Sequence, residues 1–518
     1  MPRSRLVLVA FVPVVLAVLA TGAGAARIIG TAGADVIRGG PEADVLHGLG
    51  GNDLLDGRAG RDRVAAGRGN DRVQAFDGFA DSLACGTGAD VAAADARDAV
   101  ARDCEIVSRQ ISRDSLRNAE SQHATEVEPH AVAAGSTIVA AFQVGRIETG
   151  GAGAIGWATS RNSGRTWRSG LLPRLTRAGP GAGVWERASD PVVAYDAAHR
   201  VWLVATLALT PGRGSALAVS RSRDGLSWEA PVLVASASGA LAFDKEWIVC
   251  DNGQRSAFAG RCYLSYSDLR LNAVATRFST DGGVSWSGPV VPPDATASTA
   301  RAVGVVPVVR PDGSLVIPYY NVRQVDAIRS TDGGVSYSVP VRIAGFSFAP
   351  ARGVRAPPLP TAAVDSAGTV SVVWQSCSLR RRCDGNDLVL SRSSDGIAWS
   401  DPVRVAPAAG GRGSLLIPAL GADPRASGSL ALTWYVLAGD RLGVRAATSR
   451  DGGRNWTRAR RLDAEAMRLS WVAAAGGAMV GDYIATVVME NGRALSVFSL
   501  ASARGGKLNQ ATFAARLP

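Results

Sequence analysis

Aspartates with a fixed spacing are the clearest chemical feature of the N-terminal part of the sequence. From Gly30 onward an aspartate recurs every nine residues, and an apolar residue stands two positions after each one. Glycines precede the aspartates, and turns made of glycine expose their carbonyl oxygens. Carboxylate and carbonyl oxygens are the ligands of a hard cation, which takes about six to eight of them. The spacing therefore predicts cation sites between successive turns, with these candidate metal ligands: Asp35, Asp44, Asp53, Asp62 and Asp71.

This spacing resembles the RTX, or haemolysin-type, calcium repeat G-G-x-G-x-D-x-U-x, which forms a parallel β-roll. The resemblance implies Ca2+ as a cofactor, with the apolar residue of each repeat pointing inward. The repeat is imperfect, because Glu42 and Ala66 stand where glycine is expected and Asp81 follows Asp71 by ten residues. Arginines crowd the later coils, so fewer and weaker calcium sites are expected there. The alternative interpretation is a flexible Gly/Asp-rich linker.

A second repeat, Ser-x-Asp-x-Gly-x-x-Trp, occurs six times between residues 160 and 456, at intervals of 51 to 63 residues. A short aspartate side chain accepts hydrogen bonds from the backbone just ahead of it, and glycine supplies the positive φ of a tight turn. The aromatic residue then fills the space under the hairpin. Alternating apolar segments flank each copy, so each copy is predicted to join two strands. The third residues of the six copies are Asn162, Asp224, Asp281, Asp332, Asp395 and Asp451.

This second pattern resembles the Asp-box, or BNR, repeat of sialidases and their relatives. The resemblance covers most of residues 120 to 518 and implies an all-β fold, a sialidase-like β-propeller of six Asp-box blades. Three further strands after the sixth box, completed by an N-terminal strand, favour a seventh closing blade. A small N-terminal parallel β-roll is expected to precede it. In that family the boxes lie on the face away from the active site, so they are predicted to be structural turns.

Candidate catalytic residues follow from the same resemblance. Sialidases use three arginines to hold the substrate carboxylate, a tyrosine nucleophile activated by a glutamate, and an aspartate that handles the leaving group. An arginine fork suits a carboxylate because it donates two bonds. The alternative for each arginine is a structural ion pair with a carboxylate. For Asp190, and for the nearby Asp244 and Asp482, the alternative is a cap of a turn at the start of a strand. The mapped residues are Arg146, Arg187 and Arg355 for the clamp, Glu246 with Tyr483 or Tyr320 for the nucleophile pair, and Asp190 for the acid/base.

The six cysteines form three close pairs along the chain. Six cysteines allow about 15 connectivities, and pairing between neighbours is favoured because each pair shares one local segment. Free buried thiols are the alternative. The predicted disulfides are Cys85 with Cys104, Cys250 with Cys262, and Cys377 with Cys383.

The N-terminus has the features of a secretory signal peptide over residues 1–25. Arg3 and Arg5 precede an apolar run from Leu6 to Leu19, and Ala23-Gly24-Ala25 fits the small-residue cleavage rule. The apolar run is short for a membrane span, and no later stretch qualifies. The mature chain is therefore expected to be extracellular. The predicted organisation is a calcium-binding roll over 26–108, a polar linker over 109–122 and the Asp-box propeller over 123–518.

The net charge is +11, and Lys245 and Lys507 are the only lysines, so almost every cation is arginine. The arginines are scattered and lack the interleaved aromatics of a nucleic-acid-binding surface. We expect no nucleic acid as a partner, a glycan or sialoside as substrate or ligand, and a monomer. Two functions stay open: an exported glycoside hydrolase of exo-sialidase type, and a non-catalytic glycan-binding or surface-binding protein with a calcium-stabilised adhesion module. The enzyme requires the mapped residues to converge at one site, whereas the binder requires only a concave polar surface.

Overall fold

The computed structural model describes residues 16–19, 24–293, 301–322, 324–405, 413–502 and 507–517. The chain divides into two compact units, Met1–Arg109 and Gln110–Pro518. The signal peptide predicted for residues 1–25 lies outside the described residues, apart from residues 24 and 25 and the short strand β1 (Leu16–Leu19).

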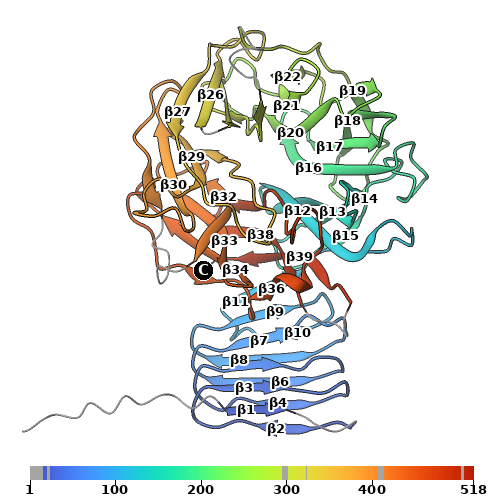
Figure 1. The fold of residues 1–518 in the computed structure, drawn as a ribbon, viewed down its shortest axis with the longest axis vertical. Helices are drawn as coiled ribbons and strands as arrows, with labels where there is room; N and C mark the ends of the chain where they lie inside the picture. The colour runs from blue at the N-terminus through green and yellow to red at the C-terminus, as the bar shows by residue number, and fades with distance from the viewer. Residues whose placement is uncertain are drawn as a thin grey trace, which may run out of the picture. The chain divides into compact units, whose positions relative to one another are not determined.

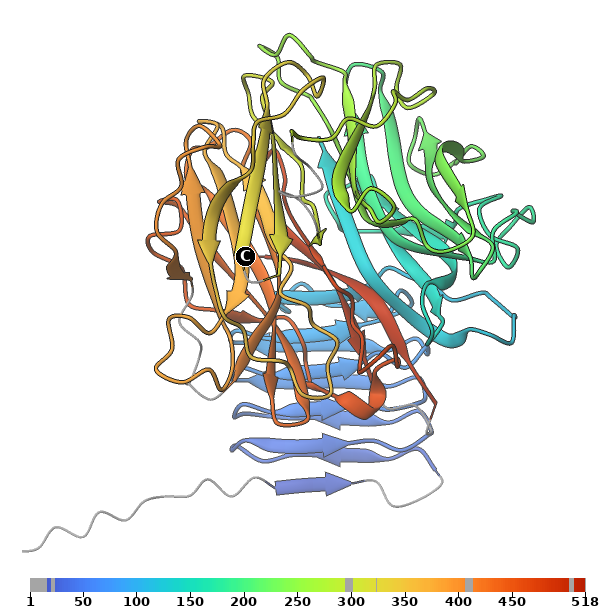
Figure 2. The same cartoon turned by 45° about the horizontal axis from the view of Figure 1, so that its top comes forward.

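The first unit is a β-solenoid whose successive coils pair in parallel (Figure 1; Figure 2). Leu54 pairs with Arg72, 18 residues further on, so two nine-residue repeats make one coil. One sheet has the order β10-β8-β6-β4-β2, and the other contains β1, β3, β5, β7, β9 and β11. After β1 the strands are β2 (Arg27–Ile29), β3 (Asp35–Arg38), β4 (Val45–His47), β5 (Leu54–Asp56), β6 (Arg63–Arg68), β7 (Arg72–Ala75), β8 (Ser82–Thr87), β9 (Val91–Ala94), β10 (Ala99–Val100) and β11 (Ile106–Gln110).

The apolar residues that follow the aspartates form the core of the solenoid. Because side chains alternate along each short strand, one residue per repeat points inward and stacks on its counterpart in the next coil. The stack continues past the fifth aspartate through Leu83 and Ala92, beside the Cys85–Cys104 disulfide. Its first members are Ile28, Ile37, Leu46, Leu55, Val64 and Val73.

The structure corrects the predicted fold class. The chain is all-β, but the N-terminal part is a β-solenoid of several turns with its own core, and not a small addition to a sialidase-like β-propeller of six Asp-box blades plus a closing blade. The physical reason lies after Asp71, where a ten-residue step leaves the parallel pairing intact. Asp81 and Asp90 resume the pattern, so coils continue to pair as far as β11.

The second unit consists of antiparallel sheets that follow one another around a ring (Figure 1). Strands that follow one another in the chain pair with one another, so nearly all of each sheet comes from one continuous segment. The first four sheets contain β12 (Gln122–Ala134), β13 (Thr137–Arg146), β14 (Ala152–Ser160) and β15 (Arg168–Leu171); β16 (Arg187–Asp196), β17 (Val201–Thr210), β18 (Gly214–Ser222) and β19 (Val232–Ser238); β20 (Phe243–Cys250), β21 (Cys262–Asp268) and β22 (Ala273–Ser279); and β23 (Ala302–Val303), β24 (Val308–Val309), β25 (Leu315–Asn321), β26 (Gln324–Ser330) and β27 (Val341–Gly345).

The remaining sheets of the ring bring the chain back to the first one, since Thr125 of β12 pairs with Gln510 of the last strand. A single short 3-10 helix, η1 (Leu469–Trp471), precedes the last sheet within the described residues. These sheets contain β28 (Thr361–Val364), β29 (Val370–Ser376), β30 (Asp387–Ser393) and β31 (Val403–Val405); β32 (Ser414–Ala422), β33 (Leu430–Ala438), β34 (Arg441–Ser449), β35 (Arg460–Arg461) and β36 (Met467–Arg468); and β37 (Ala485–Val488), β38 (Ala494–Ala501) and β39 (Gln510–Arg516).

The segment predicted as a linker over residues 109–122 contributes to the second unit. The Ile111 N–H donates to the Thr512 carbonyl at 2.9 Å, and the Ser112 hydroxyl accepts from the Thr512 N–H at 2.8 Å. Ile111 and Leu116 are buried in an apolar cluster with residues of β13, β14 and β38. This part of the chain is therefore ordered against the strands that close the ring.

Five of the six Ser-x-Asp turns join two consecutive strands of one sheet, as between β18 and β19, and the third copy follows β22. In the second copy, Asp224 Oδ1 accepts the N–H groups of Leu226 at 2.8 Å and Ser227 at 2.7 Å. The same acceptance recurs in the other copies, and in the first copy Asn162 Oδ1 accepts the N–H of Thr166 at 2.9 Å. The acceptor residues are Asn162, Asp224, Asp281, Asp332, Asp395 and Asp451.

The three predicted disulfides are confirmed. Cys85 bonds to Cys104, Cys250 to Cys262 and Cys377 to Cys383, and no described cysteine is free. The second pair joins directly opposed residues of β20 and β21, so it fixes two neighbouring strands of one sheet.

Candidate functional site

Three inner strands of the ring are interrupted at equivalent places. Glu128 in β12, Asp190 in β16 and Lys245 in β20 have φ angles of 53°, 50° and 51°. The strand register shifts at each of them, as in a β-bulge. Glu128 and Asp190 precede prolines, whose missing N–H needs no partner at the interruption. All three side chains therefore leave the strand alternation and line one pocket.

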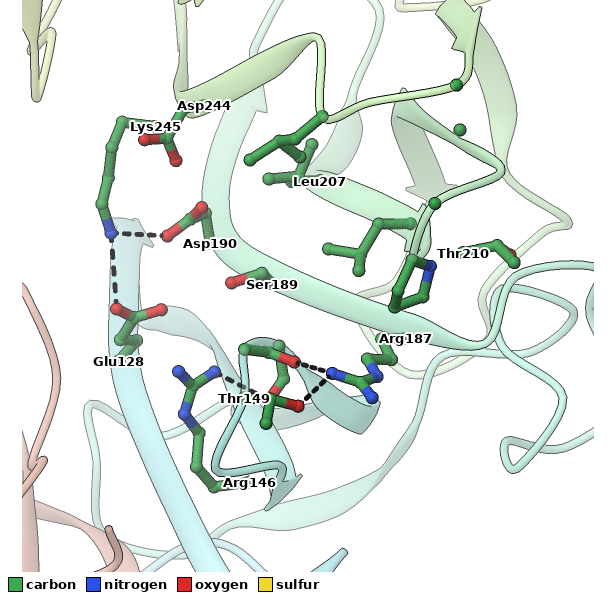
Figure 3. A pocket seen from close by; sticks show the side chains of 18 of the residues that line it. Glu128, Arg146, Thr149, Arg187, Ser189, Asp190, Leu207, Thr210, Asp244 and Lys245 are labelled. Carbon is green, nitrogen blue, oxygen red and sulfur yellow. Dashed lines mark hydrogen bonds and ion pairs between the residues drawn. The ribbon is translucent and has the colours of Figure 1, made fainter. Parts of the chain in front are cut away.

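The pocket, which we call the Lys245 pocket, has a volume of about 460 Å³ (Figure 3). Its polar lining brings together carboxylates and cations from β12, β13, β16 and β20. Leu207, Leu209 and Leu241 form an apolar part of the wall. Its charged lining residues are Glu128, Arg146, Arg187, Asp190, Asp244, Lys245 and Arg355.

Lys245 is the centre of this charged group. Its ammonium lies 2.8 Å from Asp190 Oδ1, 2.6 Å from Asp482 Oδ2 and 3.5 Å from Glu128 Oε1. Burial alone would lower the pKa of Lys245, but the surrounding carboxylates outweigh it and hold the pKa well above its ordinary value. Burial likewise tends to raise the pKa of Asp482, yet Lys245 and Arg355 hold it far below the usual range. Lys245 and Asp482 are thus charged and locked together.

Glu128, unlike Asp482, has a pKa that is raised toward neutrality. Its side chain is 1% exposed, and burial raises its pKa to about 7, with Lys245 opposing this rise and Asp190 and Asp482 adding to it. One carboxyl oxygen accepts from the Gln143 side chain and the other from the Asp482 N–H. A carboxyl group with a pKa near the working pH can both donate and accept a proton. Glu128 is therefore the group in the pocket best suited to acid/base chemistry.

The three arginines of the predicted clamp all line the Lys245 pocket, but each has protein partners. Arg146 donates to the Gly151 carbonyl at 2.7 Å, and its Nε has no hydrogen-bond partner among the described residues. Arg187 donates to the Thr149 hydroxyl at 2.8 Å and the Gly150 carbonyl at 3.0 Å (Figure 3). Arg355 forms two bonds to the Asp482 carboxylate, at 2.8 and 2.7 Å. Arg146 and Arg187 are thus the two clamp arginines that form no ion pair with a carboxylate of the described residues, whereas Arg355 is paired with Asp482.

The predicted nucleophile pair is not brought to the pocket. Tyr483 is 8% exposed and packs edge-on against Trp247, and its hydroxyl donates to the Pro191 carbonyl at 3.2 Å. Burial and nearby carboxylates raise its pKa well above the ordinary value, the opposite of activation. Glu246 is buried and its carboxyl oxygens have no hydrogen-bond partner among the described residues. Tyr320, the alternative, packs against Phe346 in a different apolar cluster.

The sequence reasoning missed Glu128 and Lys245 as site residues. Both stand in the strand-opening phrases, and Glu128-Pro129 matches Asp190-Pro191. For Glu128 the signal was a charged residue before a proline inside an apolar strand, because proline within a strand marks a bulge or an edge. Lys245 precedes Glu246 and carried no such signal. Asp244, taken as a possible turn cap, lines the pocket, whereas Asp482 supports it through Lys245 and Arg355.

The predicted calcium ligands form two ladders along the solenoid. From Asp53 onward, an aspartate Oδ1 accepts the N–H of the aspartate one coil earlier, for example Asp53 from Asp35 at 2.8 Å and Asp71 from Asp53 at 2.8 Å, whereas Asp44 Oδ1 accepts the Ala26 N–H. One carboxylate oxygen is buried and has no hydrogen-bond partner among the described residues in each of Asp53, Asp62, Asp71 and Asp90. A β-carbon added at Gly57 would lie 2.1 Å from Asp62 Oδ2, so glycine is required beside the carboxylate.

These buried and unpartnered carboxylate oxygens fit calcium. Burial raises the pKa of Asp53 to about 6 and that of Asp62 to about 7, with neighbouring aspartates adding to the rise. A divalent cation would replace the missing hydrogen-bond donors and neutralise the ladder. Asp62, Asp77 and Asp81 also place ligand atoms within 4.8 Å of one another, at the ten-residue step. The donor set is all oxygen, which matches a hard cation.

Comparison with known proteins identifies the N-terminal repeats. The family profile of the RTX calcium-binding nonapeptide repeat (4 copies) matches residues 21–55, 39–73 and 56–92. No curated protein matches the chain by sequence. No helix of the described residues has the length and hydropathy needed to cross a membrane.

The solved structures that match this chain share little sequence with it. A protein of unknown function from Dyadobacter fermentans DSM 18053 is 16% identical, with 64% of this chain and 94% of that chain covered and a TM-score of 0.43. An α-L-arabinanase of Penicillium chrysogenum is 14% identical, with 79% and 98% covered and a TM-score of 0.43. The NanB sialidase of Streptococcus pneumoniae is 10% identical, with 79% and 70% covered and a TM-score of 0.43. What the comparisons establish is that this chain carries RTX repeats, which bind Ca2+, at its N-terminus.

Proposed function

We propose that this chain is an exported, calcium-binding protein that acts on glycans in the Lys245 pocket, by hydrolysis of a glycosidic bond. The observation that carries the proposal is Glu128, a buried carboxyl whose pKa is raised to about 7 inside a polar pocket of monosaccharide size. Glycoside hydrolysis requires such an acid to protonate the leaving oxygen. Export is supported by the predicted signal peptide and by three disulfides, which form in oxidising compartments.

Each polar group of the pocket has a role in this proposal. Glu128 donates its proton to the glycosidic oxygen as the bond from that oxygen to the anomeric carbon breaks. A water oxygen then bonds to the anomeric carbon, and the proton that this water loses returns to Glu128. Asp190, whose Oδ1 lies 2.8 Å from the Lys245 ammonium, faces the same space and stabilises the positive charge that develops on the sugar ring. Arg146 and Arg187 direct guanidinium groups at hydroxyl or carboxylate groups of the sugar. Calcium bound by the RTX repeats stabilises the solenoid and takes no part in these steps.

The position of Tyr483 argues against the sialidase mechanism, in which a tyrosine is the nucleophile. A tyrosine nucleophile must reach the anomeric carbon, but the Tyr483 hydroxyl is bonded to a backbone carbonyl inside the core. We therefore propose hydrolysis with carboxyl groups alone, and an anionic sugar as the preferred substrate because of the arginines.

A second candidate function is glycan binding without catalysis. It is favoured by Lys245, whose contacts with Asp190, Asp482 and Glu128 leave few carboxylate oxygens for a substrate. In this alternative the two arginines hold an acidic sugar, and the pocket is a lectin-like recognition site.

The test is release of a fluorescent leaving group from a panel containing a sialoside, a glucuronide and an arabinofuranoside, with calcium present. We expect turnover of an anionic glycoside, its loss in Glu128→Gln and a raised KM in Arg187→Ala. Tyr483→Phe is the matched control, since it removes only the hydroxyl bonded to Pro191, and it is expected to retain activity. No turnover of any glycoside, with binding measured by calorimetry, would replace hydrolysis by the binding function. If Tyr483→Phe were the only variant to lose activity, Tyr483 would instead be assigned as the nucleophile.

A further inference from the structure

A second cavity of about 320 Å³ lies at the first Ser-x-Asp turn, apart from the Lys245 pocket. The turn packs on the last sheet of the ring, since a β-carbon at Gly164 would lie 2.4 Å from Leu495 Cδ1 and 3.7 Å from Arg516 Cγ. Four arginines line the cavity, and neither an aspartate nor a glutamate is among its described lining residues. These four arginines, which define what we call the arginine cavity, are Arg161, Arg165, Arg493 and Arg516.

The charge of this cavity depends on one departure from the turn pattern. The third residue is aspartate in five copies of the turn and asparagine, Asn162, in this copy. Asn162 still serves the turn, because its Oδ1 accepts the Thr166 N–H at 2.9 Å and its Nδ2 donates to the Thr166 hydroxyl at 2.8 Å. The turn therefore keeps its geometry while the cavity loses the carboxylate that the other copies carry.

The arginine side chains are accessible to a ligand. All four are exposed, and Arg165 and Arg493 have no side-chain ion pair among the described residues. Arg161 donates to the Asp224 carbonyl at 3.3 Å, and its guanidinium lies 3.8 Å from the Asp224 carboxylate. Guanidinium groups bind oxyanions through paired N–H donors and attract them over a distance of about 10 Å in salt. The cavity thus has the charge and the donors for an anionic group.

We propose that the arginine cavity binds the sulfate or carboxylate group of an anionic polysaccharide. Its volume admits a single sugar unit with its charged substituent. Single-stranded nucleic acid fits less well, because base stacking needs aromatic side chains and the described lining contains none. The proposal goes beyond the proposed function, because it requires no catalysis and none of the residues of the Lys245 pocket.

The test measures binding of a fluorescent heparin-derived hexasaccharide by anisotropy, with calcium present. Asn162→Asp restores the carboxylate of the other turns, so it is expected to fold normally and to raise Kd about fourfold, from one unit charge about 5 Å away in water. Arg493→Gln is expected to raise Kd similarly. Gln254→Glu adds the same charge on another exposed loop and is expected to leave Kd unchanged.

Further arms separate the sources of the anionic group. Binding of a carboxylate-only hyaluronan fragment, equally sensitive to Asn162→Asp, indicates recognition of any anionic sugar, whereas binding of heparin alone indicates sulfate, and both support the proposal. An unchanged Kd in Asn162→Asp overturns it, as does an equal loss in Gln254→Glu. Equally tight binding of a thymidine oligonucleotide of matched charge also overturns it in favour of nucleic acid. Glu128→Gln is expected to bind as wild type does, so failure of the proposed hydrolysis leaves this result unaffected.

Discussion

Replacing Asp62 by asparagine is expected to change thermal stability in opposite directions with and without calcium. Asp62 is 1% exposed; its Oδ1 accepts the Asp44 N–H at 2.7 Å, and its Oδ2 has no hydrogen-bond partner among the described residues. Burial, with Asp81 and Asp44 adding to it, raises the pKa of Asp62 from 3.8 to about 7. Asparagine keeps the Oδ1 acceptor and removes the charge.

The magnitude follows from the linkage between this pKa and folding. In the unfolded chain the pKa is 3.8, so the folded state binds a proton more tightly, and ionisation favours unfolding. Without calcium, the free-energy cost of ionising Asp62 in the folded state is absent below the unfolded-state pKa of 3.8. This cost grows as the pH rises and is complete above about 7. A rise of about three pH units corresponds to about 4 kcal/mol at about 1.36 kcal/mol each. We halve this to about 2 kcal/mol because water between the coils screens the charge.

Bound calcium reverses the sign of the stability change that Asp62→Asn causes. A bound cation takes the ionised carboxylate as a ligand, so the charge that destabilises the metal-free solenoid stabilises the loaded one. Scanning calorimetry at about pH 8 should therefore show that Asp62→Asn raises Tm by on the order of 10 °C in a chelator and lowers it in excess calcium. At about pH 4 in a chelator the two proteins should unfold together.

Glu42→Gln is the control, since Glu42 is an exposed carboxylate on the same unit. It should leave Tm unchanged in either condition. A fall in Tm of Asp62→Asn in the chelator at high pH would refute the reasoning. That result would mean that hydrogen bonding to the carboxylate, and not a missing cation, stabilises the coil.

Three further predictions concern the second unit. Hydrolytic activity should fall as pH rises through about 7, because only the protonated form of Glu128 donates, and a pH profile of kcat/KM measures this. Lys245→Met should destabilise the fold by about 3–5 kcal/mol in urea unfolding, because it leaves buried carboxylates uncompensated, whereas the exposed Lys507→Met should not. Asp281→Ala should cost about 1–2 kcal/mol in the same assay because it orphans backbone N–H groups of the turn. Asp281→Asn should cost under about 0.5 kcal/mol, because Asn162 already performs that role in its own turn.

The solenoid shows how much of a structure the spacing of residues can predict by itself. Nine-residue recurrence of aspartate and of an inward apolar residue determines the coil, its core and its calcium ligands, because each interaction repeats between neighbouring coils. The spacing predicted a roll over 26–108, but it did not show how the coils accommodate the ten-residue step from Asp71 to Asp81. Only the pairing of β6 with β8 showed that the chain absorbs the extra residue, between Asp71 and Asp81, without losing register.

The turn copies determined where hairpins occur and which residues hold them, since those hydrogen bonds join residues a few positions apart. Local pairing of cysteines was predictable for the same reason. For the Lys245 pocket the family resemblance supplied Arg146, Arg187, Asp190 and Arg355. It missed Glu128 and Lys245, because the residues of the pocket come from different sheets and meet only when the ring closes. The bulges at Glu128, Asp190 and Lys245 turn these side chains into the pocket. Tyr483, which the sequence had placed in the site, instead packs in an apolar cluster just before β37. Short-range patterns thus decided the elements, and long-range packing decided which charges share a pocket and what their pKa values are.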